Sequence, residues 1–214
     1  MHTGIKAGVI GELGTSWPIH QFEKNVLRAA AKLQSELNVP VIIHPAIPFE
    51  APFEVMRLFT EAGGKASKTI MSHLDLAMRE RTDILLEFAA TSKAICELDM
   101  FGNEVSYFAF EGVDMPNDAT RIKMVQALIG DGYGDRIAIS QDIHLKSRLV
   151  SDSFDPSCEP KSDSFVIVFF QMKYGGHGFS HILLNVVPKM LQRGITQQQI
   201  DQILINTPRQ WLTL

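Results

Sequence analysis

The sequence has few of the features that mark secreted, membrane-spanning or nucleic-acid-binding proteins. Its 214 residues include two cysteines, Cys96 and Cys158, too few for a disulfide scaffold and typical of a reducing compartment. No apolar run approaches the roughly 18 residues that span a bilayer, no Asn-x-Ser/Thr acceptor occurs, and the first residues are not those of a signal or transit peptide. The formal net charge of −4 predicts no general attraction to nucleic acid or anionic lipid. We therefore expect a cytoplasmic protein that binds neither nucleic acid nor membrane.

The sequence does contain enough apolar residues for a packed core, since 45% are hydrophobic and 21% are charged. Short apolar runs alternate with amphipathic stretches at a period of about 30 residues, which is typical of βαβ units and a parallel sheet. The predicted strands are 8–11, 41–43, 69–72, 94–98 and 136–140. The predicted helices are 21–36, 51–62, 76–91, 118–129, 180–192 and 196–204.

Polar side chains that can take part in catalysis follow the predicted strands. They are Glu12, His44, His73, Asp99 and Asp142. Reactive groups at the carboxyl ends of many successive strands are typical of a (β/α)₈ barrel, because all of its strand ends surround one mouth. A doubly wound sheet shares the strand–helix alternation, but a small-molecule binder of that class needs a glycine-rich phosphate turn that residues 11–14 do not supply.

Four of these residues have the chemistry of a metal site: Glu12, His44, His73 and Asp142. Imidazole nitrogen and carboxylate oxygen suit zinc, manganese and similar ions, and a carboxylate can bridge two of them. Asp142 could hold a nucleophilic water and accept its proton. Each residue alone could equally be structural, as a hydrogen-bonded histidine or a turn-capping carboxylate. Spacing alone leaves the two interpretations equally open.

Two further signals lie outside this set. His177 and His181 are four residues apart, but no Glu follows the first, so we favour a structural role over one in lining a substrate pocket. Residues 150–171 fit no βα unit, since a Ser/Asp/Pro-rich stretch precedes the apolar segment 165–170. We interpret them as an atypical insertion, with a gene-model artefact as the alternative. Transcript sequencing across residues 149–174 would distinguish the two.

Several motifs, taken in order, resemble the phosphotriesterase-related proteins of the phosphotriesterase family, in the amidohydrolase superfamily. They are Gly-Glu-Leu-Gly-Thr-Ser-Trp-Pro at 11–18, His-Pro at 44–45, Met-Ser-His-Leu-Asp at 71–75, Leu-Asp-Met-Phe-Gly at 98–102, Ser-Gln-Asp-Ile-His at 140–144, Lys-Tyr-Gly-Gly-His-Gly-Phe-Ser-His at 173–181 and Asn-Thr-Pro-Arg-Gln-Trp-Leu at 206–212. The resemblance covers nearly the whole chain except 150–171.

The resemblance implies a (β/α)₈ TIM barrel with two divalent cations, usually Zn²⁺. By the same resemblance Glu12 is the bridging carboxylate, where bacterial phosphotriesterases have a carbamylated lysine, and His44 and His73 ligate the second metal. The resemblance also implies that Asp142 ligates the first metal and is the catalytic residue that shuttles the proton. This branch of the family is associated with hydrolysis of small N-acyl amino acids such as N-acetyltaurine, so the expected partner is a small-molecule substrate.

The sequence departs from the family at its beginning. The family's first strand carries a His-x-His pair that completes the first metal's shell, and this chain has none. We therefore expect residues 1–214 to form one incomplete barrel domain with about strands 4 to 8. The alternative function is that of a catalytically inactive truncated isoform or scaffold. A homodimer is one expectation for the assembly, which the sequence leaves open.

Overall fold

In the part of the chain that the structure describes, a five-stranded parallel sheet has its strands paired in sequence order. A computed structural model describes residues 4, 7–79, 81–104, 114–144 and 177–213. The strands are β1 (Ile10–Gly14), β2 (Val41–His44), β3 (Thr69–Met71), β4 (Ile95–Leu98) and β5 (Ile137–Ile139). Each strand pairs in parallel with the next. This order is that of a barrel arc, because a doubly wound sheet reverses its strand order at a switch point.

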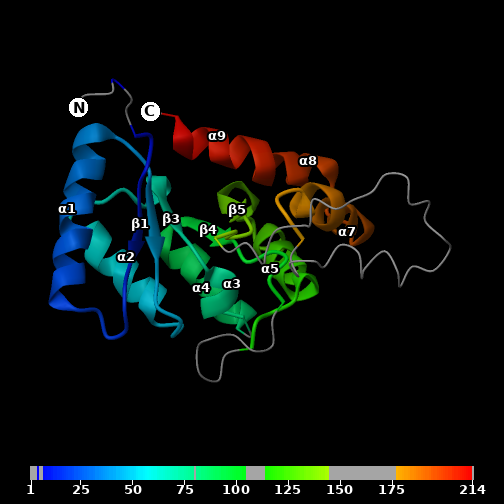
Figure 1. The fold of residues 1–214 in the computed structure, drawn as a ribbon, viewed down its shortest axis with the longest axis horizontal. Helices are drawn as coiled ribbons and strands as arrows, with labels where there is room; N and C mark the ends of the chain where they lie inside the picture. Colours follow the sequence, from blue (N-terminus) through cyan, green and yellow to red (C-terminus); the bar gives the residue numbers. More distant parts are fainter. Residues whose placement is uncertain (1–3, 5–6, 80, 105–113, 145–176, 214) are drawn as a thin grey trace.

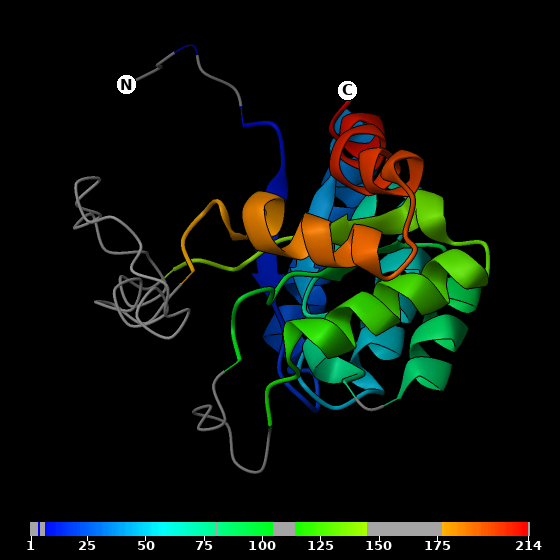
Figure 2. The ribbon, with the colours of Figure 1, turned by 90° about the vertical axis from the view of Figure 1, so that its right-hand side faces the viewer.

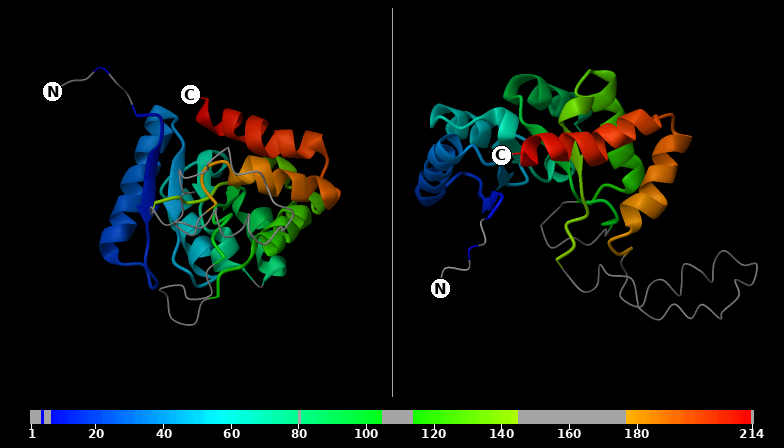
Figure 3. Two further views of the ribbon diagram at one scale, coloured as in Figure 1. Left: turned by 45° about the vertical axis from the view of Figure 1, so that its right-hand side comes forward. Right: turned by 90° about the horizontal axis from the view of Figure 1, so that it is seen from above.

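Helices connect the strands and follow the sheet around its arc (Figures 1 and 3). They are α1 (Gln21–Leu37), α2 (Ala51–Glu61), α3 (Leu74–Ala77), α4 (Thr82–Ser92) and α5 (Asp118–Gly130), with 3₁₀ turns η1 (Ala66–Lys68) and η2 (Gly134–Arg136). The C-terminal part contains a π-helical segment η4 (Ile182–Val186), then α7 (Val187–Gln192), α8 (Gln197–Asp201), a π-helical segment η5 (Gln202–Asn206) and α9 (Thr207–Leu212).

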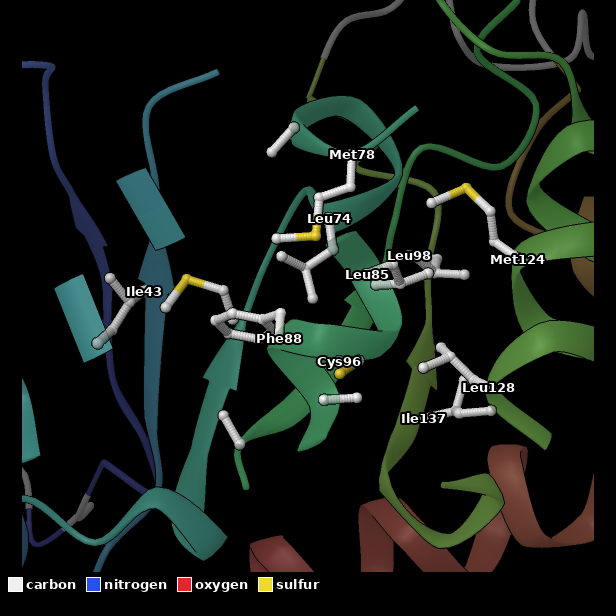
Figure 4. Close-up of a cluster of buried hydrophobic side chains, with 14 of the residues drawn as sticks. Ile43, Leu74, Met78, Leu85, Phe88, Cys96, Leu98, Met124, Leu128 and Ile137 are labelled. Atoms are coloured by element: carbon white, nitrogen blue, oxygen red, sulfur yellow. The ribbon is translucent and has the colours of Figure 1, made fainter. Parts of the chain in front are cut away.

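The main hydrophobic core lies between the sheet and the helices. Figure 4 shows Ile43 and Leu98 from the strands with Phe88 of α4 and Leu128 of α5, and all four side chains are fully buried. Because side chains alternate along a strand, the neighbouring residues face the other side of the sheet. There, Ile42, Ile70, Ile95 and Ala138 form a smaller cluster with Trp211 of α9. Both faces are apolar, as expected for strands of a parallel sheet.

The helices α8 and α9 lie at the amino ends of the strands (Figure 2). Thr207 donates a hydrogen bond to the carbonyl of Asp135, just before β5, and Lys68, just before β3, donates one to the carbonyl of Thr213. These contacts close the end of the sheet opposite to the carboxyl ends, where the predicted site residues lie. None of the helices in the described part of the chain could span a membrane.

Two elements near the predicted site residues differ from the sequence-based predictions. The first strand was expected at 8–11 and lies at Ile10–Gly14, because Leu13 and Gly14 pair with β2 and draw Glu12 into the strand. The expected helix 76–91 is divided into α3, which begins directly after His73, and α4, because Met78 and Arg81 between them have non-helical backbone conformations.

The other elements agree with the predictions to within a few residues, except that the last predicted helix continues through η5 and α9 to Leu212. The proposed insertion at 150–171, with its apolar segment 165–170, lies outside the described residues. The division into one domain with an insertion therefore stays a prediction.

Candidate metal centre

Three predicted ligands meet at the carboxyl ends of neighbouring strands. Glu12 lies on β1, His44 is the last residue of β2 and His73 comes two residues after β3. Oε1 of Glu12 is 3.5 Å from Nδ1 of His44 and 3.4 Å from Nε2 of His73, and those two ring nitrogens are 2.8 Å apart. One ligand atom from each residue lies within 4.8 Å of the others. The parallel register therefore brings together residues that are far apart in the sequence.

The orientation of His73 is set by Asp99, which follows β4. Nδ1 of His73 is 2.7 Å from Oδ1 of Asp99, and the backbone N–H of His73 donates to both carboxylate oxygens at 3.2 Å. A proton on Nδ1 shared with Asp99 leaves Nε2 directed toward Glu12 and His44, and such a carboxylate contact is how proteins fix a ligating imidazole. The sequence indicates a strand-end position for Asp99 but no role. Its position beside His73 depends on the pairing of β3 with β4.

The electrostatics of the cluster favour a positive charge at its centre. Hydrogen bonds from His44 and His73 hold the pKa of Glu12 well below its usual range, although partial burial opposes them. Burial of His73 disfavours its charged form, but hydrogen bonds to Asp99 and Glu12 outweigh it and raise the pKa of His73 to about 11. The imidazolium proton thus occupies the place where a cation would sit. One carboxylate oxygen and two imidazole nitrogens fit a zinc-type ion and leave coordination positions for water or substrate.

The structure places Asp142 outside this three-residue group. Asp142 follows β5 with a left-handed φ of 44°, and its Oδ2 is 3.2 Å from Nδ1 of His144. The described ligand atoms within 4.8 Å of one another belong to Glu12, His44 and His73. The role of Asp142 as ligand and proton shuttle therefore stays a prediction.

A second carboxyl group, that of Glu97, lies next to the cluster and was not singled out from the sequence. Glu97 lies on β4 and accepts a hydrogen bond of 3.0 Å from Oγ of Ser72, the residue before His73. Burial and the nearby charge of Asp99 raise the pKa of Glu97 to about 8, which favours the neutral form of its carboxyl group. The available signal was an acidic residue inside an otherwise apolar strand.

A buried ion-pair network, also missed from the sequence, lies behind the site. Arg121 of α5 is fully buried and donates to Asp75 at 2.7 Å, to Asp118 at 2.9 Å and to the carbonyl of Asn103 at 2.8 Å. Asp118 also accepts a hydrogen bond of 2.6 Å from Nε2 of His181. A fully buried arginine is uncommon without such partners, but its pattern in the sequence is that of an ordinary helix residue.

The chain is similar in sequence to known proteins. The sequence model of the Phosphotriesterase family matches residues 1–154 and 166–212. The chain is 50% identical over 212 residues to the N-acetyltaurine hydrolase of Danio rerio and 46% identical to that of Homo sapiens, covering 99% of this chain and 54% of each relative. The chain thus spans about half the length of these curated relatives.

Solved structures share the fold. A resiniferatoxin-binding protein from Rhodobacter sphaeroides superposes with a TM-score of 0.82 at 24% identity, covering 98% of this chain and 52% of that one. The phosphotriesterase homology protein from Escherichia coli, complexed with phosphate in its active site, gives a TM-score of 0.75 at 26% identity, covering 99% of this chain and 61% of that one. With its motifs, its parallel arc and its matched family model, the chain belongs to the phosphotriesterase family.

Proposed function

We propose that this chain forms the metal-binding part of a hydrolase that cleaves the amide bond of small N-acyl amino acids such as N-acetyltaurine. The observation that carries the proposal is the convergence of Glu12, His44 and His73 at one end of the sheet. The names of the relatives support the substrate class, since the chain is 46% to 50% identical to N-acetyltaurine hydrolases. The proposed cofactors are two divalent cations, with zinc favoured by the donor set.

Divalent cations in such a site polarise a carbonyl oxygen and lower the pKa of a bound water. Glu12, His44 and His73 would hold them, and Asp99 would keep Nε2 of His73 directed at the site through its bond to Nδ1. Asp142 would accept the proton of the attacking water on its carboxylate. It would then return that proton to the amine nitrogen as the amide bond breaks.

The alternative is a catalytically inactive scaffold that holds one metal weakly, because the chain has no His-x-His pair. Metal analysis of the purified protein together with an N-acetyltaurine hydrolysis assay distinguishes the two. We expect two zinc ions per chain, with turnover that is lost in Asp142→Asn. Substoichiometric metal and no turnover in the parent chain would contradict the proposed enzyme and favour the scaffold.

A further inference from the structure

The chain returns to the carboxyl end of the sheet at residues 177–181. Gln141, the neighbour of Asp142, donates a hydrogen bond of 2.6 Å to the carbonyl of Gly178. Three residues later His181 is buried, and its ring stacks on that of His177 with the ring centroids 4.3 Å apart. The start of the C-terminal helical segment is thus attached next to the candidate site.

His181 is held on both ring nitrogens and lies against the loop that follows β4. Its Nε2 is 2.6 Å from Oδ2 of Asp118, and its Nδ1 is 3.0 Å from the side-chain nitrogen of Asn185. Asp118 in turn accepts the backbone N–H of Gly102 at 2.9 Å. Gly102 has a φ of +82°, and a Cβ there would lie 3.0 Å from the His181 ring, so the ring and the loop are in close contact.

This loop is held by buried side chains at two further backbone groups. The N–H of Met100 donates to Asp75 at 3.1 Å, and the carbonyl of Asn103 accepts from Arg121 at 2.8 Å. Arg121 links Asp75 to Asp118, so the three attachments form one network. In this network His181 is the member that comes from the C-terminal helical segment.

The loop begins with Asp99, the residue that orients His73. We propose that His181 is a positioning residue for the metal centre: through Asp118 it fixes the loop that carries Asp99, and thereby the direction of Nε2 of His73. The expected effect on metal affinity rests on the proposed function. The contacts that link His181 to the loop with Asp99, and so to His73, are present in the metal-free protein.

Three variants of the full chain separate positioning from general stability. His181→Leu removes the hydrogen bond to Asp118, whereas His181→Gln keeps an N–H that can donate to it. Val186→Ala is the matched control, because Val186 is fully buried on the same helical segment and takes no part in the network. For each protein, isothermal titration calorimetry measures the zinc affinity, and urea denaturation measures the free energy of unfolding.

We expect His181→Leu to weaken zinc binding about tenfold, the lower end of the range for groups that orient metal ligands. His181→Gln and Val186→Ala should stay within about threefold of the parent. If Val186→Ala weakens zinc binding as much as His181→Leu at equal loss of stability, or if His181→Leu leaves the affinity unchanged, the positioning role is wrong.

A metal-free measurement tests the coupling separately from the proposed function. The Nδ1 proton of His73, shared with Asp99, is observed by NMR in the presence of a chelator. We expect it to exchange with solvent at least tenfold faster in His181→Leu and at the parent rate in Val186→Ala. Equal rates in all variants would overturn the inference, whereas a parent chain that binds no zinc but shows this pattern would overturn only the proposed function.

Discussion

At the scale of the residue, His73 holds a proton where the proposed function requires a metal ion. Its hydrogen bonds to Asp99 and Glu12 outweigh its burial and raise its pKa to about 11, so the ring is charged at neutral pH in the metal-free protein. A ligating imidazole must lose the proton on the nitrogen that binds. Metal and proton therefore compete for Nε2 of His73.

We predict that the zinc affinity of the chain rises with pH between 6 and 8, by about tenfold per pH unit for each proton displaced. Isothermal titration in two buffers of different ionisation enthalpy measures the protons released. His20→Gln is the control, because His20 lies at the start of α1 outside the cluster and its removal should leave the pH dependence unchanged. An affinity that does not vary with pH would show that the ion binds elsewhere.

Glu97 gives a second prediction at this scale. Its pKa is about 8 in the folded protein against an ordinary value of 4.5, so the native state binds more protons than the unfolded state between these values. The free energy of unfolding therefore falls as pH rises from about 4.5 to about 8, by at most about 1.4 kcal/mol per pH unit from this group. Glu97→Gln should remove this slope.

Urea unfolding at pH 5 and pH 7.5 in a chelator measures the effect. The stability of Glu97→Gln relative to the parent should increase between the two pH values, while Glu36→Gln, a change on the exposed face of α1, should run parallel to the parent. Parallel curves for Glu97→Gln as well would mean that the carboxyl is already ionised at pH 5.

The candidate metal ligands could be predicted from the sequence, but the residues that position them could not. Glu12, His44 and His73 follow from polar side chains at strand ends, because parallel strands bring those ends to one place. The contacts of Asp99 and of the buried Arg121 depend on side chains 26 and 46 residues apart in the sequence. No local pattern encodes such pairs, since they are set by strand register and helix packing.

At the scale of the element, β1 shows how a glycine places a ligand. Gly11 has a φ of +125°, and a Cβ at this position would lie 2.5 Å from the carbonyl oxygen of Ile42 on β2. The pairing of β1 with β2 is irregular between Ile10 and Leu13, the stretch that contains Glu12. The close approach of the two strands at Gly11 is therefore coupled to the position of Glu12.

We predict that Gly11→Ala lowers the free energy of unfolding by about 1–3 kcal/mol through backbone strain, and weakens zinc binding by moving Glu12. Gly14→Ala, on the same strand, has open space around the added methyl group and is the control. Urea unfolding and zinc titration of both variants test this. Equal effects of the two substitutions would show that the contact with Ile42 is not restrictive.

Strand and helix order was predictable, but element boundaries near the site were not. Hydrophobic periodicity indicates which face of a helix or strand is buried. It does not indicate where the backbone bends to direct a side chain into the site. The predicted helix 76–91 missed the interruption between α3 and α4, where Met78 and Arg81 have non-helical backbone conformations. The left-handed backbone of His73 and its bonds to Asp99 bear on the start of α3, which local propensity does not report either.

At the scale of the whole molecule, the sheet is an open arc. Among the described residues β1 pairs only with β2 and β5 only with β4, so each outer strand has one unpaired edge. Unpaired strand edges are prone to associate with other strands. The chain also spans about half the length of its curated relatives.

We predict that the isolated chain self-associates as its concentration rises. Sedimentation velocity at several concentrations measures this association. Phe22→Ser removes a highly exposed aromatic side chain on α1, on the helix-covered side of the sheet, and should leave the association unchanged if strand edges cause it. A monomer at every concentration would contradict the prediction, and loss of association in Phe22→Ser would assign it to the helical surface.

The two tryptophans lie at opposite ends of the sheet and can serve as separate optical probes. Trp211 of α9 packs against the smaller apolar cluster of the sheet, so its fluorescence emission should report unfolding at the amino ends of the strands. Trp17 is 41% exposed and lies two residues beyond Thr15, whose N–H donates to the carbonyl of His44. Its fluorescence should respond to changes at the mouth. The fluorescence of the two tryptophans should therefore distinguish binding at the site from unfolding of the chain without any added label.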